Sequence, residues 1–189
     1  GYRKKIDTLI SDFEKVLCRS QKWKRDYKRD YIRHYENNHD NTPVWILMNY
    51  LMLGQAFKFY EFQPESMRNS IAKSFSDLYS ETHEVGKRIS PRRLRLAYDH
   101  IKDFRNICAH DERLFCARVS PSCDVNLVGV LSDLELVLTE DDYKMLRRNI
   151  LLDALKLSDE LSNDASARVL FAMGVNELSS VFPKEILGL

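Results

Sequence analysis

The segment SPRRLRLAYDHIKDFRNICAHDERLF, residues 90–115, carries a clear helix signal. Ser90 is a typical N-cap residue, and Pro91 suits the first helical position because its missing N–H needs no partner there. We predict a helix that begins at Pro91 and runs to about residue 110, with a continuation to 116 left open. At 100° per residue one side of this helix is apolar. That side consists of Leu96, Ile101, Phe104, Ile107, Cys108, Leu114 and Phe115.

Apolar residues at helical spacing on both sides of this segment predict an all-α protein. Residues 44–60 are almost entirely apolar, which predicts a central buried helix. In residues 22–36, Trp and Tyr side chains recur four residues apart, which predicts packing in the core rather than stacking on bases. The expected helices span residues 3–19, 22–36, 44–60, 64–79, 139–163 and 165–173, and the tail at 175–189 is expected to form one more turn or short helix.

The region between these helices is less regular. Residues 117–138 combine Pro121 with Val- and Leu-rich stretches, and we expect a short hairpin or an irregular loop there. Thr139, with an acidic residue three positions later, resembles a capping box, and Gly174 is expected to end the last helix. A chain of 189 residues suits one domain over 1–189, in which the portion 119–189 has a less certain role.

The composition excludes several classes of protein. Glycine (6) and proline (5) are too scarce for a sandwich or barrel with many tight turns. No apolar run reaches the roughly 18 residues of a membrane-spanning helix. The first ten residues lack the apolar core of a signal peptide. We therefore expect a cytoplasmic protein without membrane association.

The charge is balanced in total but uneven along the chain. The formal net charge of +1 excludes a protein that is basic throughout, such as a coat for DNA. Basic residues outnumber acidic ones eleven to five in residues 1–33 and nine to four in 87–118, whereas 124–164 carry four basic and ten acidic residues. A basic surface attracts polyanions. Mutual neutralisation of these segments within the fold is an equally good interpretation.

The polar side of the helix at 91–110 collects groups that suit phosphodiester chemistry. A histidine takes or gives a proton at neutral pH, and an arginine binds phosphate bidentately and stabilises charge on a pentacoordinate transition state. Asparagine can orient the phosphate or the imidazole. RNA supplies its own nucleophile, the 2′-hydroxyl, so no metal is required. The residues within this arc are Lys102, Arg105, Asn106, Ala109, His110 and Arg113.

The spacing between arginine and histidine is a weak signal by itself. Arg-x-x-x-x-His occurs three times, as Arg29 to His34, Arg95 to His100 and Arg105 to His110. His100 lies on the apolar side of its helix and is interpreted as a core histidine, and Arg29 has no asparagine beside it. Without further context, a solvated helix face would be the commoner interpretation of Arg105 and His110.

We expect neither a metal nor a cofactor. The four cysteines (Cys18, Cys108, Cys116 and Cys123) include no Cys-x-x-Cys pair, and no histidine stands at ligand spacing beside them. No cluster of carboxylates resembles a magnesium site.

Two separate parts of the chain resemble one protein family. RNICAHDERLF resembles the HEPN motif of the Abi-like (AbiD/AbiF-type) abortive-infection family, in which Arg-Asn-x-x-Ala-His is followed by an arginine three residues after the histidine. RDYIRHYENN and then TPVWILMNYLMLGQAFKFY are similar to that family's basic, Tyr-rich helix, its Pro-x-Trp and its apolar helix with a central glycine. MRNSIAKSF and ISPRRLRLAYDHIKDFRN continue the pattern in the same order. The resemblance covers about residues 25–118.

The resemblance implies an all-α HEPN-type helical bundle and a metal-independent, toxin-like endoribonuclease in defence against phage. It implies that Arg105 and His110 are catalytic, that Asn106 supports them and that Arg113 contacts RNA phosphate. Lys102, on the same face, is expected to bind phosphate as well. Family members usually have a longer N-terminal portion, and the sequence leaves open whether N-terminal helices are missing here. The acidic residue directly after the histidine departs from the family pattern.

One chain offers one convincing histidine at this site, whereas acid–base cleavage generally needs two proton-transfer groups. We therefore predict a two-fold homodimer whose interface contains the site. Cleavage by 2′-hydroxyl attack would leave a 2′,3′-cyclic phosphate and a 5′-hydroxyl. The alternative is a non-catalytic HEPN module that binds a small RNA or a protein partner through the same face. A helical interaction protein with no nucleic-acid role is a third interpretation, and the sequence does not identify a neutralising partner.

Overall fold

The computed structural model describes residues 2–18, 30–110, 112–121 and 124–174. Within these ranges the chain forms nine α-helices, a short 3₁₀ helix and no β-strand, so the all-α prediction is confirmed. The turn or helix expected at 175–189 lies outside the described residues. The chain divides into two compact units, Gly1–Pro64 and Glu65–Leu189, each of which is described by itself. One domain over 1–189 stays a prediction.

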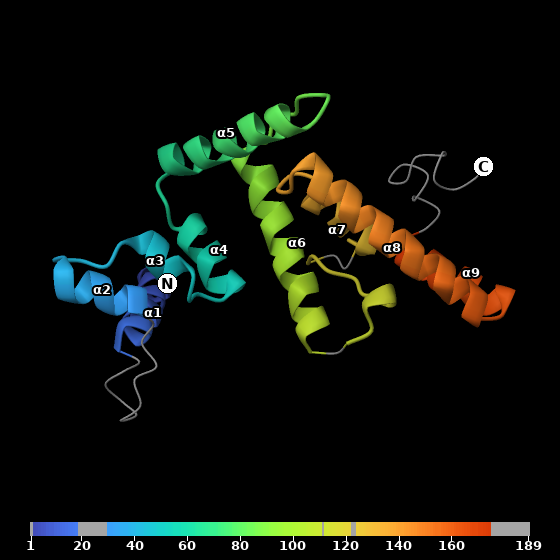
Figure 1. Cartoon of the computed structure of the whole chain (residues 1–189), viewed down its shortest axis with the longest axis horizontal. Helices are drawn as coiled ribbons and strands as arrows, with labels where there is room; N and C mark the ends of the chain where they lie inside the picture. Colours follow the sequence, from blue (N-terminus) through green and yellow to red (C-terminus); the bar gives the residue numbers. More distant parts are fainter. Residues whose placement is uncertain (1, 19–29, 111, 122–123, 175–189) are drawn as a thin grey trace. The chain divides into compact units, whose positions relative to one another are not determined.

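The first unit is built around a small apolar cluster. Its helices are α1 Tyr2–Leu17, α2 Asp30–Asn38, α3 Val44–Met48 and α4 Leu53–Glu61 (Figure 1). The buried members of the cluster are Val16, Ile32, Ile46 and Leu47. Tyr35 packs against them, which agrees with the core interpretation of the aromatic stripe. The side chains of Trp23, Tyr27 and Tyr31 lie outside the described part of the chain.

The single buried helix predicted at 44–60 is wrong, because α3 and α4 occupy this stretch as separate helices. The backbone leaves helical geometry at Met52 (φ −66°, ψ 151°). The N–H of Met52 donates to Gln55 Oε1 at 2.9 Å and so starts α4. The apolar pattern concealed this break because Met52 is itself apolar. Met52 is 66% exposed and Trp45 61%, so the stretch buries only part of its apolar surface.

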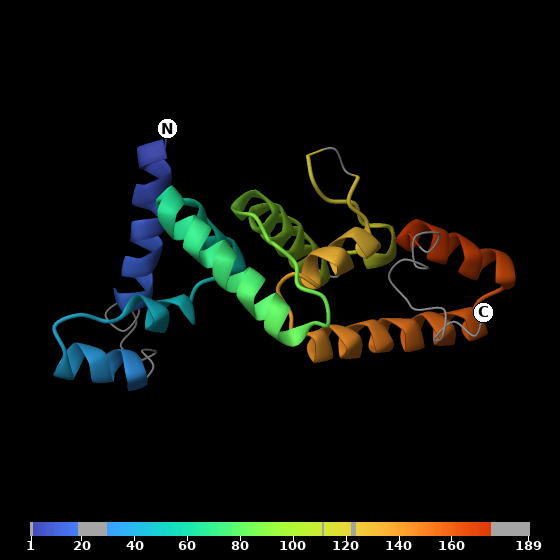
Figure 2. The same cartoon turned by 90° about the horizontal axis from the view of Figure 1, so that it is seen from above.

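The second unit contains the segment with which the sequence analysis began. Its elements are α5 Glu65–Thr82, α6 Pro91–Ala109, the 3₁₀ helix η2 Leu114–Cys116, α7 Leu127–Leu134, α8 Glu140–Glu160 and α9 Asn163–Met173. Helix α6 packs against α5 and α7, and α8 and α9 run antiparallel as a pair (Figure 2). None of the helices in the described ranges combines the length and the apolar character that a bilayer crossing requires.

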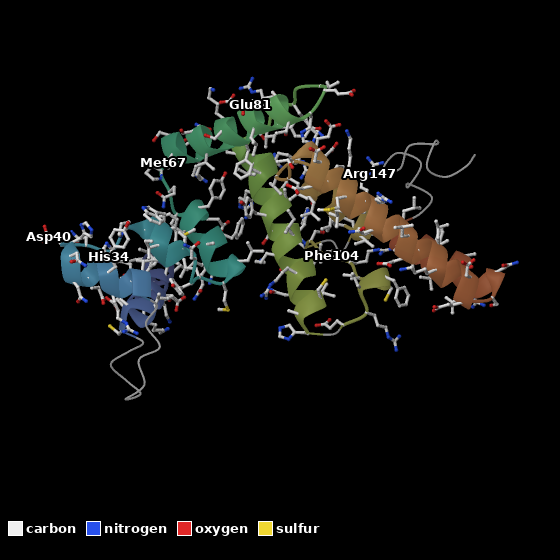
Figure 3. All side chains as sticks on the ribbon, in the orientation of Figure 1. His34, Asp40, Met67, Glu81, Phe104 and Arg147 are labelled. Carbon is white, nitrogen blue, oxygen red and sulfur yellow. The ribbon has the colours of Figure 1, made fainter. Side chains whose placement is uncertain are left out.

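Helix α6 begins where the sequence predicted. Ser90 Oγ accepts the N–H of Arg93 at 3.1 Å, and Pro91 lies in the first turn. Leu94 and Ala97 are completely buried, and Phe104, labelled in Figure 3, is 4% exposed. Phe104 belongs to a core cluster with residues of the 119–130 region. These contacts determine which side of α6 remains exposed.

The continuation of α6 to residue 116 is wrong. Ala109 is its last residue, and His110 is the C-cap (φ −107°, ψ 15°). The N–H of Glu112 then donates to Ile107 O at 3.2 Å, and η2 follows. The acidic pair after His110 opposes a longer helix, because negative charge is unfavourable at a helix C-terminus. Cys108 and Phe115, both expected on the packed side, are exposed.

A helix occupies part of the region where we expected a hairpin or irregular loop. Residues 117–121 and 124–126 are irregular and contain one antiparallel bridge, between Val119 and Val125. The next residues form α7, and the Oδ1 of its N-cap Asn126 accepts the N–H of Gly129 at 2.9 Å. Its buried valines favour strands by propensity. Their burial in the core outweighs that preference.

The predicted start of α8 and the predicted end of α9 are confirmed, whereas α8 ends at Glu160 and not at 163, and α9 begins at Asn163 and not at 165. The N–H of Asp142 donates to Thr139 Oγ1 at 3.3 Å, and the Thr139 hydroxyl donates to Asp142 Oδ2 at 2.7 Å. Gly174 ends α9 in the left-handed region at φ 96°. These signals are local, so the sequence alone could locate them.

Candidate functional site

The C-terminal end of α6 presents three predicted site residues on its exposed side. Arg105, Asn106 and His110 are all exposed. Phe104 and Ile107, on the opposite side of the same turns, are packed in the core. Asn106 follows Arg105 directly and lies one turn before His110, so it stands between them on the helix surface. The structure therefore brings these three residues to one end of the helix.

Few contacts within the chain occupy these polar groups. Arg105 Nη1 donates to Asn106 Oδ1 at 3.4 Å, which is long for a hydrogen bond. His110 is held through its backbone N–H, which donates to Asn106 O at 3.1 Å and Ile107 O at 3.2 Å. Within the described part of the chain, neither Arg105 nor His110 forms an ion pair. Their side-chain nitrogens can therefore meet a ligand without first breaking an ion pair with a described residue.

Arg113 does not lie on the helix face where we expected it. It is the N-cap of η2 (φ −70°, ψ 99°) and is exposed. The predicted helical spacing between His110 and Arg113 is therefore wrong, because the chain turns after His110. The two residues share one short connection between α6 and η2. A phosphate contact by Arg113 stays a prediction.

Lys102 is already engaged by two carboxylates. Its Nζ lies 2.7 Å from Asp99 Oδ1 and 3.2 Å from Asp103 Oδ1. Partial burial acts to lower the pKa of Lys102, but the hydrogen bonds and negative charges of Asp99 and Asp103 outweigh it, so the pKa is raised. The ammonium is therefore charged, and its field is largely offset by two neighbouring acids.

At this end of α6, the positive charge that would bind a phosphate has to come from arginine side chains. A helix C-terminus carries partial negative charge from its last carbonyls. Glu112 is exposed just beyond it. A phosphate at this end of α6 would therefore gain nothing from the helix and would depend on the guanidinium groups of Arg105 and Arg113.

A buried ionic cluster lies further back on α6, and the sequence analysis found only its histidine. Asp133 of α7 is 2% exposed, and its Oδ2 lies 2.7 Å from His100 Nδ1. Arg93 pairs with the other carboxylate oxygen. The side chain of His100 is 12% exposed, which confirms the core interpretation. The missed signal was Asp133 itself, a lone acid within the apolar run LVGVLSDL.

The described residues contain no group of three His, Cys, Asp or Glu side chains that could hold a metal ion. Cys18, Cys108 and Cys116 are free and exposed. The polar groups at the end of α6 are thus an arginine, an asparagine and a histidine, a set suited to proton transfer and to binding an anion.

A family model described as Abi-like protein matches residues 2–116, more than half of the chain. The chain belongs to the Abi-like family. The match contains both segments that carry the resemblance, RDYIRHYENN and RNICAHDERLF. It ends at η2, so α7, α8 and α9 of this Abi-like protein lie beyond it. Searches among curated proteins and among solved structures found no match.

Proposed function

We propose that this Abi-like protein is a metal-independent endoribonuclease of the HEPN superfamily and the AbiD/AbiF type. The observation that carries the proposal is the exposed face of Arg105, Asn106 and His110, whose charged groups have no ion-pair partner within the described ranges. The motif RNICAHDERLF supports the superfamily, and the family match supports a toxin-like role in abortive infection of phage-infected cells.

The proposed reaction needs proton transfer and charge stabilisation but no added nucleophile. The 2′-oxygen of RNA attacks the adjacent phosphorus while a base takes its proton. The P–O5′ bond then breaks, and the leaving 5′-oxygen receives a proton. The products are a 2′,3′-cyclic phosphate and a 5′-hydroxyl. His110 moves the proton, and Arg105 stabilises negative charge on the phosphorane.

A second copy of the chain would complete this site. Taking one proton and giving another is most direct with two groups on opposite sides of the phosphate, and His110 is the only histidine at this end of α6. A two-fold dimer that brings two Arg105–His110 faces together supplies both groups. We therefore include a homodimer in the proposal.

The two other cationic residues of the candidate site, Arg113 and Lys102, are expected to contribute unequally. Arg113, on the connection after α6, is expected to contact an RNA phosphate near His110. Lys102 can bind phosphate only by leaving Asp99 and Asp103, so its contribution is expected to be the smaller of the two. Asn106 orients the guanidinium of Arg105 through their hydrogen bond.

The test is cleavage of a labelled single-stranded RNA by the full chain in the presence of EDTA. We expect cleavage to persist, to fail on the matching DNA, and to leave a 2′,3′-cyclic phosphate detectable by mass spectrometry. Arg105→Ala and His110→Ala should each lower the rate by about 10²- to 10⁴-fold. The matched control is His34→Ala, because His34 is an exposed histidine five residues after an arginine in the other unit.

Three outcomes would contradict this proposal. A requirement for a divalent metal, or full activity in both Arg105→Ala and His110→Ala, would contradict the proposed mechanism. RNA that copurifies with the chain and is never cleaved would instead favour the non-catalytic binding module. In that case His110→Ala should lower RNA affinity, and no cleavage would be measurable before or after the substitution.

A further inference from the structure

An apolar groove lies beside the candidate site in the second unit. Its volume is about 500 Å³. Side chains from η2, α7, α8 and α9 contribute to it, and its only charged lining residue within the described ranges is Asp153. The other lining residues are Leu114, Phe115, Leu127, Ile150, Ala154, Val169 and Met173.

Water is a poor occupant for such a groove. A cavity lined by apolar side chains gives water few hydrogen-bond partners. Covering apolar surface is worth roughly 25 cal/mol per Å². Leu155 and Phe171, on the two helices that flank the groove, are themselves 53% and 68% exposed. An exposed apolar groove of this kind marks a place where another segment binds.

The end of α9 is fastened at the edge of this groove. Arg118 Nη1 donates to Ala172 O at 2.8 Å and ties the end of α9 to the segment after η2. Gly174 approaches the Asn126 side chain so closely that a Cβ would collide with its amide. Met173 lines the groove itself. The described part of the chain therefore ends, at Gly174, next to the groove.

The sequence that follows suits an apolar groove. Residues 175–189 read VNELSSVFPKEILGL, with the adjacent apolar pair Val181 and Phe182 seven to eight residues after Gly174. Lys184 comes two residues later and could meet Asp153. Seven residues extend at most about 25 Å, which is ample for a site that begins at residue 173.

We propose that residues 175–189 bind the groove of their own chain, with Val181 and Phe182 in contact with the apolar lining. The consequence concerns the candidate site, since Leu114 and Phe115 directly follow Arg113. A tail seated on η2 holds the connection between His110 and η2 and so limits where Arg113 can reach. This inference goes beyond the proposed nuclease function, and its tests need no enzymatic activity.

The first test is cross-linking in the full chain after the four native cysteines are changed to serine. Ala154→Cys on the groove and Val181→Cys on the tail should form a disulfide within the monomer, seen by mass spectrometry as the loss of two thiols. The control pairs Val181→Cys with Ser74→Cys on α5, which is exposed and lines no part of the groove. This pair should remain reduced.

The second test is hydrogen exchange of η2 and of residues 150–154. Val181→Asp with Phe182→Asp should speed exchange there at least several-fold. Ser179→Asp with Ser180→Asp changes the charge equally at adjacent positions and should leave exchange unchanged. A disulfide found only between two chains would assign the groove to a second copy and overturn the proposal. Equal exchange in both double variants, or no disulfide at all, would overturn it as well.

Discussion

Two arginine–histidine pairs with the same spacing follow one another on α6 and have different surroundings. In the first, Arg95 to His100, the histidine is buried to 12% exposure against Asp133, with Nδ1 to Oδ2 at 2.7 Å. In the second, Arg105 to His110, the histidine is exposed at the C-cap and has no ion pair within the described ranges. Identical spacing thus produces a structural group in one case and an available group in the other.

Burial and an acidic partner make this difference. A carboxylate removed from water needs compensating charge, because the cost of desolvating it is several kcal/mol. Asp133 obtains this compensation from Arg93 and from its hydrogen bond with His100, and these side chains are therefore committed to the fold. Among the described residues, Asp133 is the only buried carboxylate, and it lies beside His100 and not beside His110. A motif of this kind is assigned to function by what surrounds it, and its spacing is secondary.

The largest effect is expected when the acid beside the first pair, Asp133, is removed. Asp133→Ala leaves His100 and Arg93 without their counter-charge, and we expect a loss of about 3–5 kcal/mol in the free energy of unfolding. Urea denaturation measures this loss. The control Asp103→Ala removes an exposed partner of Lys102 and should cost less than about 1 kcal/mol. Equal effects would show that burial of Asp133 does not matter.

Replacing the histidines one at a time sharpens the same contrast. His100→Gln should lower the free energy of unfolding by about 1–3 kcal/mol, because the buried Asp133 carboxylate loses the hydrogen bond with the imidazole. His110→Gln should change it by less than about 0.5 kcal/mol. Thermal and urea unfolding of the two variants give the comparison directly. A larger loss for His110→Gln would contradict our assignment of the two roles.

The opposite change is to remove the acids that pair with Lys102. Asp99→Asn with Asp103→Asn removes two negative charges from beside the ammonium of Lys102, and we expect RNA affinity at low salt to rise about two- to fivefold. The slope of log affinity against log salt should steepen by about 0.7 for one more phosphate contact with a single strand. Fluorescence anisotropy measures both. Adding Lys102→Gln to the double variant should cancel the gain, and a gain that survives would exclude Lys102 as its source.

The smallest expected effect on stability concerns the Tyr79 hydroxyl, which donates a hydrogen bond to the Glu135 carboxylate. Burial raises the pKa of Tyr79 to about 12, and the charge of Glu135, which accepts its hydroxyl at 3.2 Å, adds to the shift. Because the folded state favours the neutral phenol, this contribution is present below the unfolded pKa of about 10 and is lost as pH rises through 12.

Tyr79→Phe should therefore cost about 0.5–1.5 kcal/mol at neutral pH, the usual value of a hydrogen bond. The difference in unfolding free energy between wild type and variant should stay constant to about pH 10 and fall above it. Urea titrations across this range provide the measurement. A difference that changes between pH 6 and 9 would point to another titrating group.

The sequence predicted the features whose causes are local. Ser90, Thr139 and Gly174 end or begin helices through groups within a few residues, and all three act as expected. The burial of His100 also followed from the apolar side of one helix. The engagement of Lys102 has an equally local cause, since Asp99 and Asp103 lie within one turn, but the sequence analysis expected this lysine to bind phosphate.

Other features depend on contacts that are distant in sequence. Asp133 meets His100 across 33 residues, and no periodicity on α6 indicates that partner. The valines of α7 favour strands until the core they enter is known. Met52 interrupts the helical run at an apolar position, so the apolar pattern alone did not locate the break. Arg113 lies off the helix face because α6 ends before it. Sequence patterns locate a helix end only to within one or two residues, and that uncertainty was enough to misplace Arg113.

The cluster around Asp133 also constrains the order of folding. A helix of eight residues such as α7 is too short to persist alone in water. Its carboxylate would stay hydrated until Arg93 and His100 are in place, so α7 gains stability only as it docks on α6. The 17 residues between them, 110–126, close a loop whose entropic cost grows only slowly with its length. Helices α6 and α7 should therefore form together as an early folding nucleus, before α8 and α9 are added.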